Sequence, residues 1–240
     1  MNVLITGGTR GLGLEITRQL LDAEHCVYVV GRRMSPELER LSHDHPSQVS
    51  FLKYDLADPS QIKHRLFDEG VGVDTPLHGL VNNAALAYDD LVTNLDLNRL
   101  QEMVQTNVFA PMQLTKYAIR NMLLHKIAGS LVHVSSVSAH TGYKGLAMYA
   151  STKGAMEAFS KSVAREWGSL GIRSNCVVPG FMETDMSASI EAEQKQRIYQ
   201  RSALKQPTDI ISVAATVLFL LSDTSRSITG QNVIVDAGTV

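Results

Sequence analysis

Short apolar runs alternate with amphipathic segments along nearly the whole chain. The apolar runs are rich in β-branched residues and indicate strands at Val3–Ile5, Cys26–Val30, Val49–Leu52, Leu77–Val81, Leu131–Val134, Ser174–Val178 and Val233–Val235. Helical patterns lie between them, near 12–23, 35–43, 59–68, 97–124, 148–168 and 209–222. Near-continuous apolar strands that alternate with helices are typical of a parallel sheet covered on both faces. The pattern predicts an α/β fold with a doubly wound parallel sheet of about seven strands.

The chain has 240 residues, and no linker, repeat or low-complexity tract divides it. We therefore expect one domain over residues 1–240. Hydrophobic residues make up 44% of the chain, which suffices for a sizeable core. The least regular region, about 181–207, is polar and follows Pro179-Gly180. Two interpretations stay open for it, a mobile substrate lid and a plain surface excursion.

Charge, hydropathy and cysteine content exclude several classes of function. The net charge is −2, so no broad basic field indicates nucleic acid or an acidic membrane as partner. The longest apolar stretch, Val213–Leu221, is far shorter than the roughly 20 residues that span a bilayer. Cys26 and Cys176 have no metal-binding spacing and suit a reducing compartment. With no signal peptide visible before the first strand, we expect a cytoplasmic protein that acts on a small molecule and has no metal site.

A glycine-rich loop, Thr6–Gly13, joins the first predicted strand to the first predicted helix. This strand, glycine turn and helix form the context that a phosphate-binding loop requires. Glycines let the backbone turn tightly and let a pyrophosphate approach, and the helix N-terminus offers unpaired N–H groups to it. The alternative is a glycine-rich surface turn before an ordinary helix. Because ligands of such sheets bind beyond the carboxyl ends of the strands, further site residues should follow the other strands.

The residues after the second strand favour NADP over NAD. NAD-binding loops carry an acidic residue about 20 positions past the glycines. Here Arg32 and Arg33 occupy that region, and Arg10 lies inside the glycine loop. Guanidinium groups can bind a 2′-phosphate in bidentate fashion. The alternative is that Arg32 and Arg33 are solvated loop charges.

Tyr149 and Lys153 are four residues apart in a predicted helix, so they lie on one face, one turn apart. A nearby ammonium, together with the positive nicotinamide of an oxidised cofactor, would lower the pKa of the phenol and let Tyr149 exchange a proton with a carbonyl or an alcohol. The spacing alone is common, and packing plus a surface charge is the alternative. Ser136 follows a predicted strand, where its hydroxyl could bind a substrate oxygen. Ser135 and Ser138 compete with it for that role.

Asn107 lies inside the predicted helix 97–124, where asparagine is unfavourable because its side chain competes for backbone groups. We interpret this residue as a functional kink or a water site, with an exposed helical asparagine as the alternative. Two further polar motifs follow strands, Asp55-Leu56 after the third and Asn82-Asn83-Ala84-Ala85 after the fourth. By itself the first of these would be a cap or a turn.

Together these motifs occur in the order and spacing of a known family. They are Thr6–Gly13, Asp55, Asn82–Ala85, Asn107, Ser136, Tyr149 with Lys153, and Pro179-Gly180. The chain resembles a classical short-chain dehydrogenase/reductase. Its segments 180–186 and 228–231 resemble the 3-oxoacyl-[acyl-carrier-protein] reductases most closely. Ala85 departs from the glycine of the family by one methyl group, which a positive φ would penalise.

The resemblance implies a Rossmann fold, commonly a homotetramer, with a homodimer as the other assembly, and a role for each motif. Tyr149 would be the acid/base, and Lys153 would bind the nicotinamide ribose and tune Tyr149. Ser136 would bind the substrate oxygen, and Asn107 would hold a relay water. NADP(H) would be bound by Gly7, Thr9, Arg10, Gly11, Leu12, Gly13, Arg32, Arg33, Asp55, Leu56, Asn82, Asn83, Ala84, Pro179, Gly180, Met182 and Thr184, besides Tyr149 and Lys153.

The resemblance also implies an NADP-dependent reductase that converts a carbonyl to an alcohol, with a 3-oxoacyl thioester as the leading substrate. Two alternatives stay open, an alcohol, sugar or hydroxysteroid dehydrogenase of this family and a nucleotide-sensing protein without turnover. Ile127 and Leu170 stand where carrier-dependent relatives often have arginines. Their neighbours Lys126 and Arg173 are possible substitutes. Use of an acidic carrier protein, which needs a basic docking rim, is therefore left open.

Overall fold

The computed structural model describes residues 1–184, 187 and 190–240. Within them, seven strands form one sheet in the order β3-β2-β1-β4-β5-β6-β7, and neighbouring strands are parallel. The strands are β1 Asn2–Thr6, β2 Cys26–Gly31, β3 Val49–Lys53, β4 Gly79–Asn82, β5 Ser130–Val134, β6 Arg173–Pro179 and β7 Asn232–Val235. The helices are α1 Gly11–Asp22, α2 Pro36–Asp44, α3 Leu97–Val104, α4 Ala110–Leu124, α5 Ala147–Trp167, α6 Ala192–Tyr199 and α7 Ile210–Leu221. The predicted doubly wound parallel α/β sheet is confirmed.

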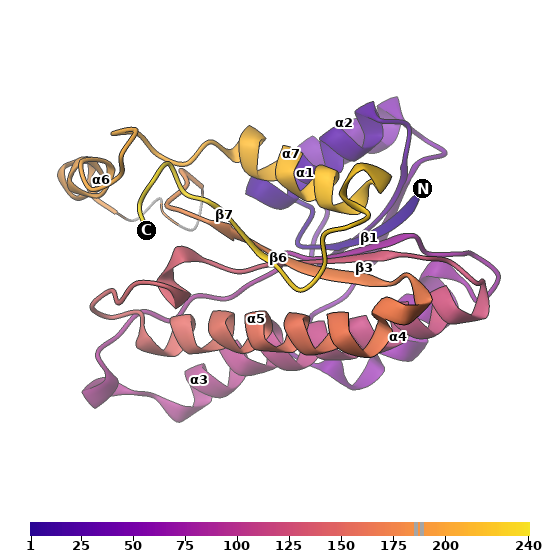
Figure 1. Cartoon of the computed structure of the whole chain (residues 1–240), viewed down its shortest axis with the longest axis horizontal. Helices are drawn as coiled ribbons and strands as arrows, with labels where there is room; N and C mark the ends of the chain where they lie inside the picture. Colours follow the sequence, from indigo (N-terminus) through magenta and orange to yellow (C-terminus); the bar gives the residue numbers. More distant parts are fainter. Residues whose placement is uncertain (185–186, 188–189) are drawn as a thin grey trace.

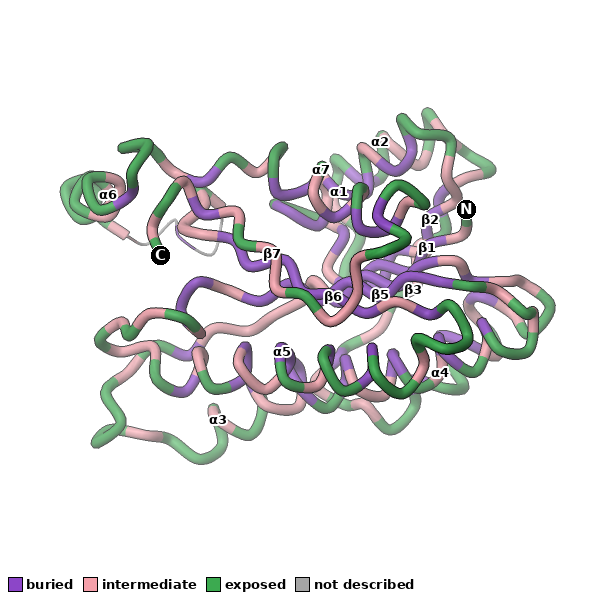
Figure 2. The backbone as a smooth tube through the Cα atoms, in the orientation of Figure 1, coloured by how far each residue is buried: buried purple, intermediate pink, exposed green. Residues whose placement is uncertain are grey.

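Helices cover both faces of the sheet. Figure 1 shows α1, α2 and α7 on one face and α3, α4 and α5 on the other. Successive side chains of a strand point to opposite faces, so Val3 and Ile5 of β1 pack with α1 and α7 while Leu4 packs with α4. The inner strands β1, β4, β5 and β6 are therefore almost wholly buried (Figure 2), and this explains why they read as continuous apolar runs, whereas the edge strands β3 and β7 keep exposed residues.

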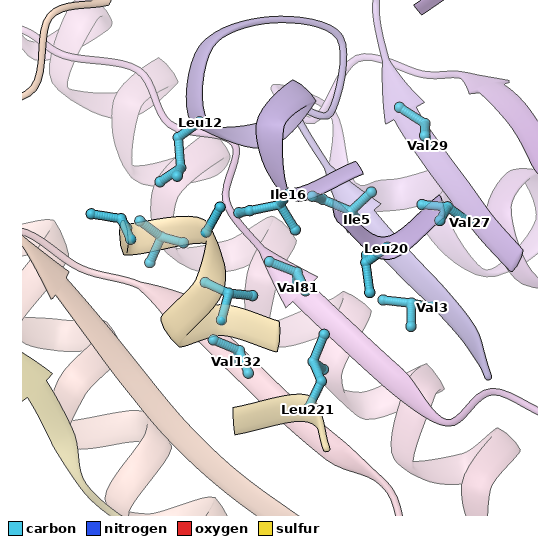
Figure 3. Packing of buried hydrophobic residues seen from close by; sticks show 14 of the residues in the cluster. Val3, Ile5, Leu12, Ile16, Leu20, Val27, Val29, Val81, Val132 and Leu221 are labelled. Atoms are coloured by element: carbon cyan, nitrogen blue, oxygen red, sulfur yellow. The ribbon is translucent and has the colours of Figure 1, made fainter. Parts of the chain in front are cut away.

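The layer formed by α1, α7 and the sheet fixes where the glycine loop can lie. Ile16 and Leu20 of α1 and Leu221 of α7 belong to one buried cluster with Val81 of β4 and Val132 of β5 (Figure 3). Full burial of an aliphatic side chain of this kind stabilises a fold by roughly 1.5–3 kcal/mol. The packed face of α1 thus holds the start of this helix directly beyond the end of β1.

Two predicted helices have a different hydrogen-bond register in the structure. The segment 59–68 forms a 3₁₀ turn, Pro59–Gln61, and then a π-helical stretch, Lys63–Val71. The segment 97–124 is interrupted by a π-helical turn, Gln105–Phe109, between α3 and α4. Apolar periodicity indicates which face of a helix is buried, but it does not distinguish these registers.

The stretch 181–207, which the pattern left irregular, contains α6. No residue of α6 is buried, so no apolar stripe in the sequence indicated a helix there. The predicted lid is this same stretch, of which residues 185, 186, 188 and 189 lie outside the described residues. Figure 1 shows α6 and the C-terminus at one end of the molecule and the N-terminus at the other. In the described part of the chain, no helix is long and apolar enough to span a membrane.

Candidate active site

The predicted motifs meet at one edge of the sheet. Parallel strands present their carboxyl ends at the same edge, and four neighbouring strands each continue into a motif there. The glycine loop follows β1, the segment 82–85 begins at the end of β4, Ser136 follows β5, and Pro179-Gly180 closes β6. Motifs that are far apart in sequence are thus gathered by strand order alone.

The glycine loop has a backbone that other residues would strain. Gly7 has φ +68° and Gly11 has φ +51°, in the left-handed region that favours glycine. A Cβ on Gly13 would lie 2.1 Å from the carbonyl oxygen of Gly7, well inside contact distance. The helix α1 that follows has no side-chain cap and no acidic residue in its first turn. Its first N–H groups and its positive dipole end are therefore left for an anionic ligand.

The segment after β4 braces this loop. The side-chain amide of Asn83 donates to the carbonyl oxygens of Thr6 at 3.0 Å and Gly7 at 3.3 Å. In return, the Thr6 hydroxyl accepts from the backbone N–H groups of Asn83 and Ala84, both at 3.0 Å. Ala85 does not have a positive φ, so its extra methyl group causes no backbone strain there.

Unlike the side chain of Asn83, which contacts the glycine loop, the side chain of Asn82 lies in the buried core. Its amide nitrogen donates to the Thr115 hydroxyl at 3.3 Å and lies 3.0 Å from Nδ1 of His133. Burial lowers the pKa of His133 to about 4, so this imidazole is neutral. Asn82 is one of the residues predicted to bind the cofactor. In the structure its side chain belongs to a buried polar network, which fixes the end of β4.

The loop after β2 is held against the glycine loop. The Ser35 hydroxyl donates to the carbonyl oxygen of Thr9 at 2.6 Å and also caps α2. A Cβ on Gly31 would lie 2.8 Å from the Thr9 methyl group, so the two loops are in close contact. Ser35 was not among the residues predicted from the sequence, although a serine directly before a proline at a predicted helix start is a capping signal.

Three arginines belong to the two loops that this contact joins. Arg10 precedes α1, Arg32 and Arg33 follow β2, and all three residues are exposed. Since Ser35 ties the two loops together, these positive charges belong to one region beside the open N-terminus of α1. Such a region is suited to a phosphate monoester.

Helix α5 places Tyr149 and Lys153 beside the end of β5. Lys153 is only 4% exposed, its Nζ donates to the carbonyl oxygen of Val134 at 2.8 Å, and this atom lies 5.6 Å from the centre of the Tyr149 ring. Burial lowers the pKa of Lys153 to about 8. Burial also raises the pKa of Tyr149 to about 12, although a hydrogen bond with Ser136 opposes the rise. The predicted lowering of the phenol pKa is therefore not produced by the protein's own groups.

The structure separates the three candidate serines. Ser136 begins a short 3₁₀ turn, its Oγ accepts from the N–H of Ser138 at 3.2 Å, and it hydrogen-bonds with Tyr149. The hydroxyl of Ser135 instead donates to Glu157 at 2.5 Å. Ser136 is thus the serine whose side chain lies at the phenol.

Asn107 lies in the π-helical turn between α3 and α4 and is 3% exposed. Its Oδ1 accepts from the N–H of Leu86 at 2.8 Å, and its Nδ2 donates to the carbonyl oxygen of Leu86 at 2.8 Å and to the Thr152 hydroxyl at 3.1 Å. Asn107 thus lies where the helix changes its hydrogen-bond pattern, and it is bonded to Thr152, the residue before Lys153. The relay water stays a prediction.

The end of β6 crosses towards the glycine loop. A Cβ on Gly180 would lie 2.4 Å from the Thr208 hydroxyl oxygen, so only glycine fits between these segments. Thr184 lies 3.7 Å from the position that a Cβ on Gly11 would occupy. Met182 packs against the core cluster beneath. The segment after β6 therefore lies next to the glycine loop, and its contact with a cofactor stays a prediction.

The pair after β3 is less directly engaged. Leu56 is buried in the core cluster on the other face of the sheet. Asp55 accepts from the N–H of Ala57 at 3.1 Å, which is the turn that its sequence alone indicates. Contact of this pair with the cofactor stays a prediction.

Comparison with known proteins assigns this arrangement to a family. A family model described as enoyl-(acyl carrier protein) reductase matches residues 7–240. The 3-oxoacyl-[acyl-carrier-protein] reductase FabG of Aquifex aeolicus is 31% identical over 238 residues, which are 98% of this chain and 95% of that protein. Carbonyl reductase [NADPH] 2 of Sus scrofa is 33% identical and covers 99% and 96% of the two chains. The chain belongs to the short-chain dehydrogenase/reductase family.

The fold of this short-chain dehydrogenase/reductase also matches solved structures. ElxO with NADP bound superimposes with a TM-score of 0.89 at 28% identity, over 99% of this chain and 98% of that chain. The family predicted from the motifs is therefore confirmed, and the protein is an oxidoreductase.

The residues present fit the dinucleotide cofactor that such an enzyme requires. The uncapped helix α1 begins at Gly11, and Gly7 and Gly11 both have a positive φ, which suits a pyrophosphate. The adjoining arginines suit a further phosphate on the ribose. Lys153, the phenol of Tyr149 and the segment at Thr184 border the same edge of the sheet, where the nicotinamide end would lie.

Proposed function

We propose that this short-chain dehydrogenase/reductase uses NADPH to reduce a carbonyl compound to an alcohol, and that its substrate class is the 3-oxoacyl thioesters. The observation that carries the proposal is the hydrogen-bonded pair of Tyr149 and Ser136 beside the buried Lys153, beyond the end of β5. An acid, a hydrogen-bond donor and a cation converge there on the place that a carbonyl oxygen would occupy.

Each side chain has one task in the proposed reaction. Bound NADPH supplies the hydride that the carbonyl carbon accepts. The Tyr149 hydroxyl donates its proton to the carbonyl oxygen, and the Ser136 hydroxyl donates a hydrogen bond to the same oxygen as negative charge develops. The Lys153 ammonium, held by the Val134 carbonyl, stabilises the phenolate that Tyr149 becomes.

The protonated phenol of Tyr149 is the form that reduction of a carbonyl requires. With the pKa of its phenol raised to about 12, Tyr149 is protonated at neutral pH and stands ready as an acid. Oxidation of an alcohol would require the phenolate as a base, which the buried site disfavours until further positive charge is bound. The oxidising dehydrogenase in its NAD-using form is the second candidate, because Arg32 and Arg33 stand after β2 where NAD-binding loops carry an acidic residue.

The cofactor predicted from the sequence is NADP(H). Structural relatives solved with NADP or NADPH bound confirm that cofactor. In this chain Arg10, Arg32 and Arg33 are the groups that we expect on the 2′-phosphate.

For the substrate, the relative from Aquifex aeolicus supports a 3-oxoacyl thioester. Whether the acyl group is carried by an acidic carrier protein is a separate question. Leu170 is 56% exposed and offers no charge, and the guanidinium of Arg173 donates to the carbonyl oxygens of Ser222 and Ile228 at 3.1 and 3.4 Å. Arg173 is thus engaged within the fold and is a poor substitute for a docking arginine. Of the four rim positions considered from the sequence, Lys126 alone offers an exposed charge, which is little for a basic docking rim, so we propose acyl thioesters that need no such rim, such as coenzyme A esters.

The test is the decay of NADPH absorbance with acetoacetyl-CoA. Tyr149→Phe should lower kcat by roughly 10²- to 10⁴-fold, because it removes the proton donor. Its Kd for NADPH should stay within about two-fold of wild type, since the ring is retained. Decay that is unchanged in Tyr149→Phe would remove this residue from the mechanism. Binding of NADPH without any decay would redirect the substrate search to sugars and steroids and would favour the nucleotide-sensing alternative.

A further inference from the structure

A carboxylate stands one helical turn beyond Lys153 on the inward side of α5. Glu157 is 8% exposed, which is rare for a glutamate. A buried carboxylate loses its hydration, and it is tolerated when it is paired and fully hydrogen-bonded. The groups that bind it therefore indicate what this charge holds in place.

Both oxygens of Glu157 are bonded. Oε1 accepts from the Ser135 hydroxyl at 2.5 Å and lies 3.0 Å from Nε2 of His140, while Oε2 accepts from the side-chain amide of Asn232 at 2.6 Å. A carboxylate only accepts, so Nε2 of His140 carries the proton in this contact. One side chain thus joins α5 to the loop after β5 and to the start of β7.

Two of these partners flank Ser136. Ser135 directly precedes it, and His140 ends the short 3₁₀ turn that it begins. Main-chain hydrogen bonds shape the turn itself, among them the Ala139 N–H to the Ser136 carbonyl oxygen at 3.0 Å, whereas Glu157 ties the turn to α5. Oε1 of Glu157 therefore clamps both ends of the turn onto α5, the helix that carries Tyr149.

We propose that Glu157 is a positioning residue, which sets the Ser136 hydroxyl against the Tyr149 hydroxyl by holding the turn from both sides. This inference rests on the proposed function, because Ser136 matters to kcat only if it binds the reacting oxygen. The hydrogen-bond partners of Glu157 are Ser135, His140 and Asn232 rather than Tyr149 or Ser136, so its action on the site passes through Ser135 and His140. A misplacement of about 1 Å at a reacting group can cost about 100-fold in rate.

The test compares Glu157→Gln with Glu166→Gln, the same chemical change at an exposed position of α5. Glu157→Gln should lower kcat roughly 10- to 100-fold with the Kd for NADPH within about two-fold of wild type. Glu166→Gln should leave both values within about two-fold. In a Ser136→Ala background, Glu157→Gln should change kcat by less than about two-fold, since its route of action is already gone. An equal loss of kcat in both backgrounds would overturn the inference.

Two further measurements keep the inference separable from folding and from the proposed function. Should Glu157→Gln not fold, His140→Ala removes one clamp at a partly exposed side chain, and its loss of kcat should likewise vanish in Ser136→Ala. Should wild type reduce no carbonyl, the proposed function fails, and ¹³C-tyrosine NMR decides the inference. The Tyr149 Cζ signal, assigned by its loss in Tyr149→Phe, should shift in Glu157→Gln and not in Glu166→Gln; an unmoved signal contradicts it.

Discussion

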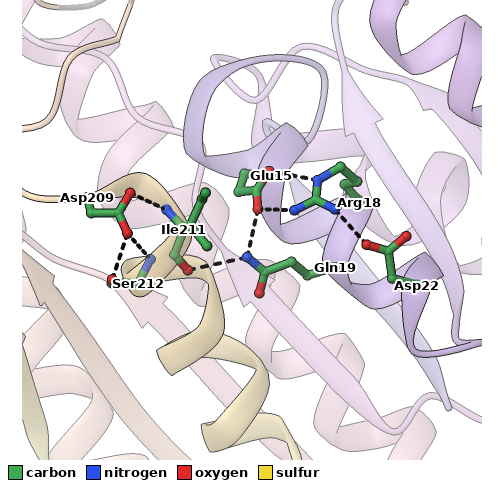
Figure 4. A network of polar contacts seen from close by, with 7 residues as sticks. All are labelled: Glu15, Arg18, Gln19, Asp22, Asp209, Ile211 and Ser212. Carbon is green, nitrogen blue, oxygen red and sulfur yellow. Dashed lines mark hydrogen bonds and ion pairs between the residues drawn. The ribbon is translucent and has the colours of Figure 1, made fainter.

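Helices α1 and α7 lie side by side on one face of the sheet, yet their N-termini are built in opposite ways. Asp209 caps α7, with its carboxylate oxygens accepting from the N–H groups of Ile211 at 3.2 Å and Ser212 at 3.1 Å. The residue before α1 is Arg10, and that helix start has no side-chain cap. Figure 4 shows the two helices joined by Gln19, which donates to the Ile211 carbonyl oxygen at 3.3 Å.

The contrast shows at which helix N-terminus the protein's own side chains bind the first N–H groups. Both helices need partners for their first N–H groups and both have a positive dipole end. At α7 the chain supplies its own anion, so this end is neutral and closed. At α1 it supplies glycines and an arginine instead, so the partner must be an anion from outside. Helices with equal packing can thus differ in function through the residue types at their first turn.

The largest effect should come from closing the open end of α1. In Gly13→Ala the new methyl group would lie 2.1 Å from the Gly7 carbonyl oxygen, so the loop must move. Overpacking of this kind costs about 1–3 kcal/mol, and displaced N–H groups no longer meet the pyrophosphate. We expect the Kd for NADPH, measured by fluorescence titration, to rise by roughly 100-fold.

A matched control is Gly168→Ala, because no atom lies within 4 Å of the Cβ that this change would add. It should bind NADPH as wild type does. A Gly13→Ala protein whose affinity stays within three-fold of wild type would show that the tight contact is not what shapes the site, and would break the contrast between the helices.

Much of this contrast could be predicted from the sequence, because it rests on local signals. Apolar periodicity gave the strands and most helices, and glycine spacing between a strand and a helix indicated the loop. Tyr149 and Lys153 are one turn apart on one helix, so a local pattern also found them. What local patterns could not supply is contact across the sheet. From the sequence alone, Glu157 resembles a surface residue of α5. Its burial depends on contacts with the loop after β5 and with the start of β7.

The lack of information on contacts across the sheet also applies to the residues predicted to bind the cofactor. Asn82 and Asn83 are neighbours with the same side chain, yet one faces a buried network and the other the glycine loop. Their alternation follows from the strand, but which face holds the ligand is set by the order of strands in the sheet. The π-helical turn at Asn107 shows the converse case, where an unfavourable residue type did indicate an irregular helix.

The next effect concerns the charges beside α1. Arg32→Asp should lower the preference for NADPH over NADH by roughly 10- to 100-fold, because a charge-assisted hydrogen bond to phosphate is worth about 1.5–3 kcal/mol. The ratio of kcat/KM for the two cofactors measures it. Arg40→Asp makes the same charge change at an exposed position of α2 and should leave the ratio within about two-fold. An unaltered ratio in Arg32→Asp would mean that the 2′-phosphate lies elsewhere.

A smaller effect is expected at the closed end of α7. Asp209→Ala should lower the free energy of unfolding by about 1 kcal/mol, the usual cost of losing an N-cap. Chemical denaturation measures this, and Asp209→Asn should retain most of the stability because asparagine caps as well. NADPH affinity should be unchanged in both variants. If Asp209→Ala bound NADPH clearly more weakly, the two helix starts would not be independent.

The smallest effect separates charge from hydrogen bonding at this cap. Hydrogen bonding to Ser212 holds the pKa of Asp209 below its ordinary value of 3.8, so the unfolded chain takes up a proton first as the pH falls. The stability due to the charged carboxylate is therefore complete well above pH 3.8 and disappears as the pH drops below that value. Because Asp209 is exposed, we expect no more than about 0.5 kcal/mol between wild type and Asp209→Asn at pH 7.

That difference should close in denaturation experiments between pH 5 and pH 2.5. A difference that persists unchanged to pH 2.5 would mean that the negative charge contributes nothing and that α7 is closed by hydrogen bonds alone. The open start of α1 would then attract its ligand through unpaired N–H groups and arginines rather than through its dipole. The pH series thus decides which physical property separates the two helices.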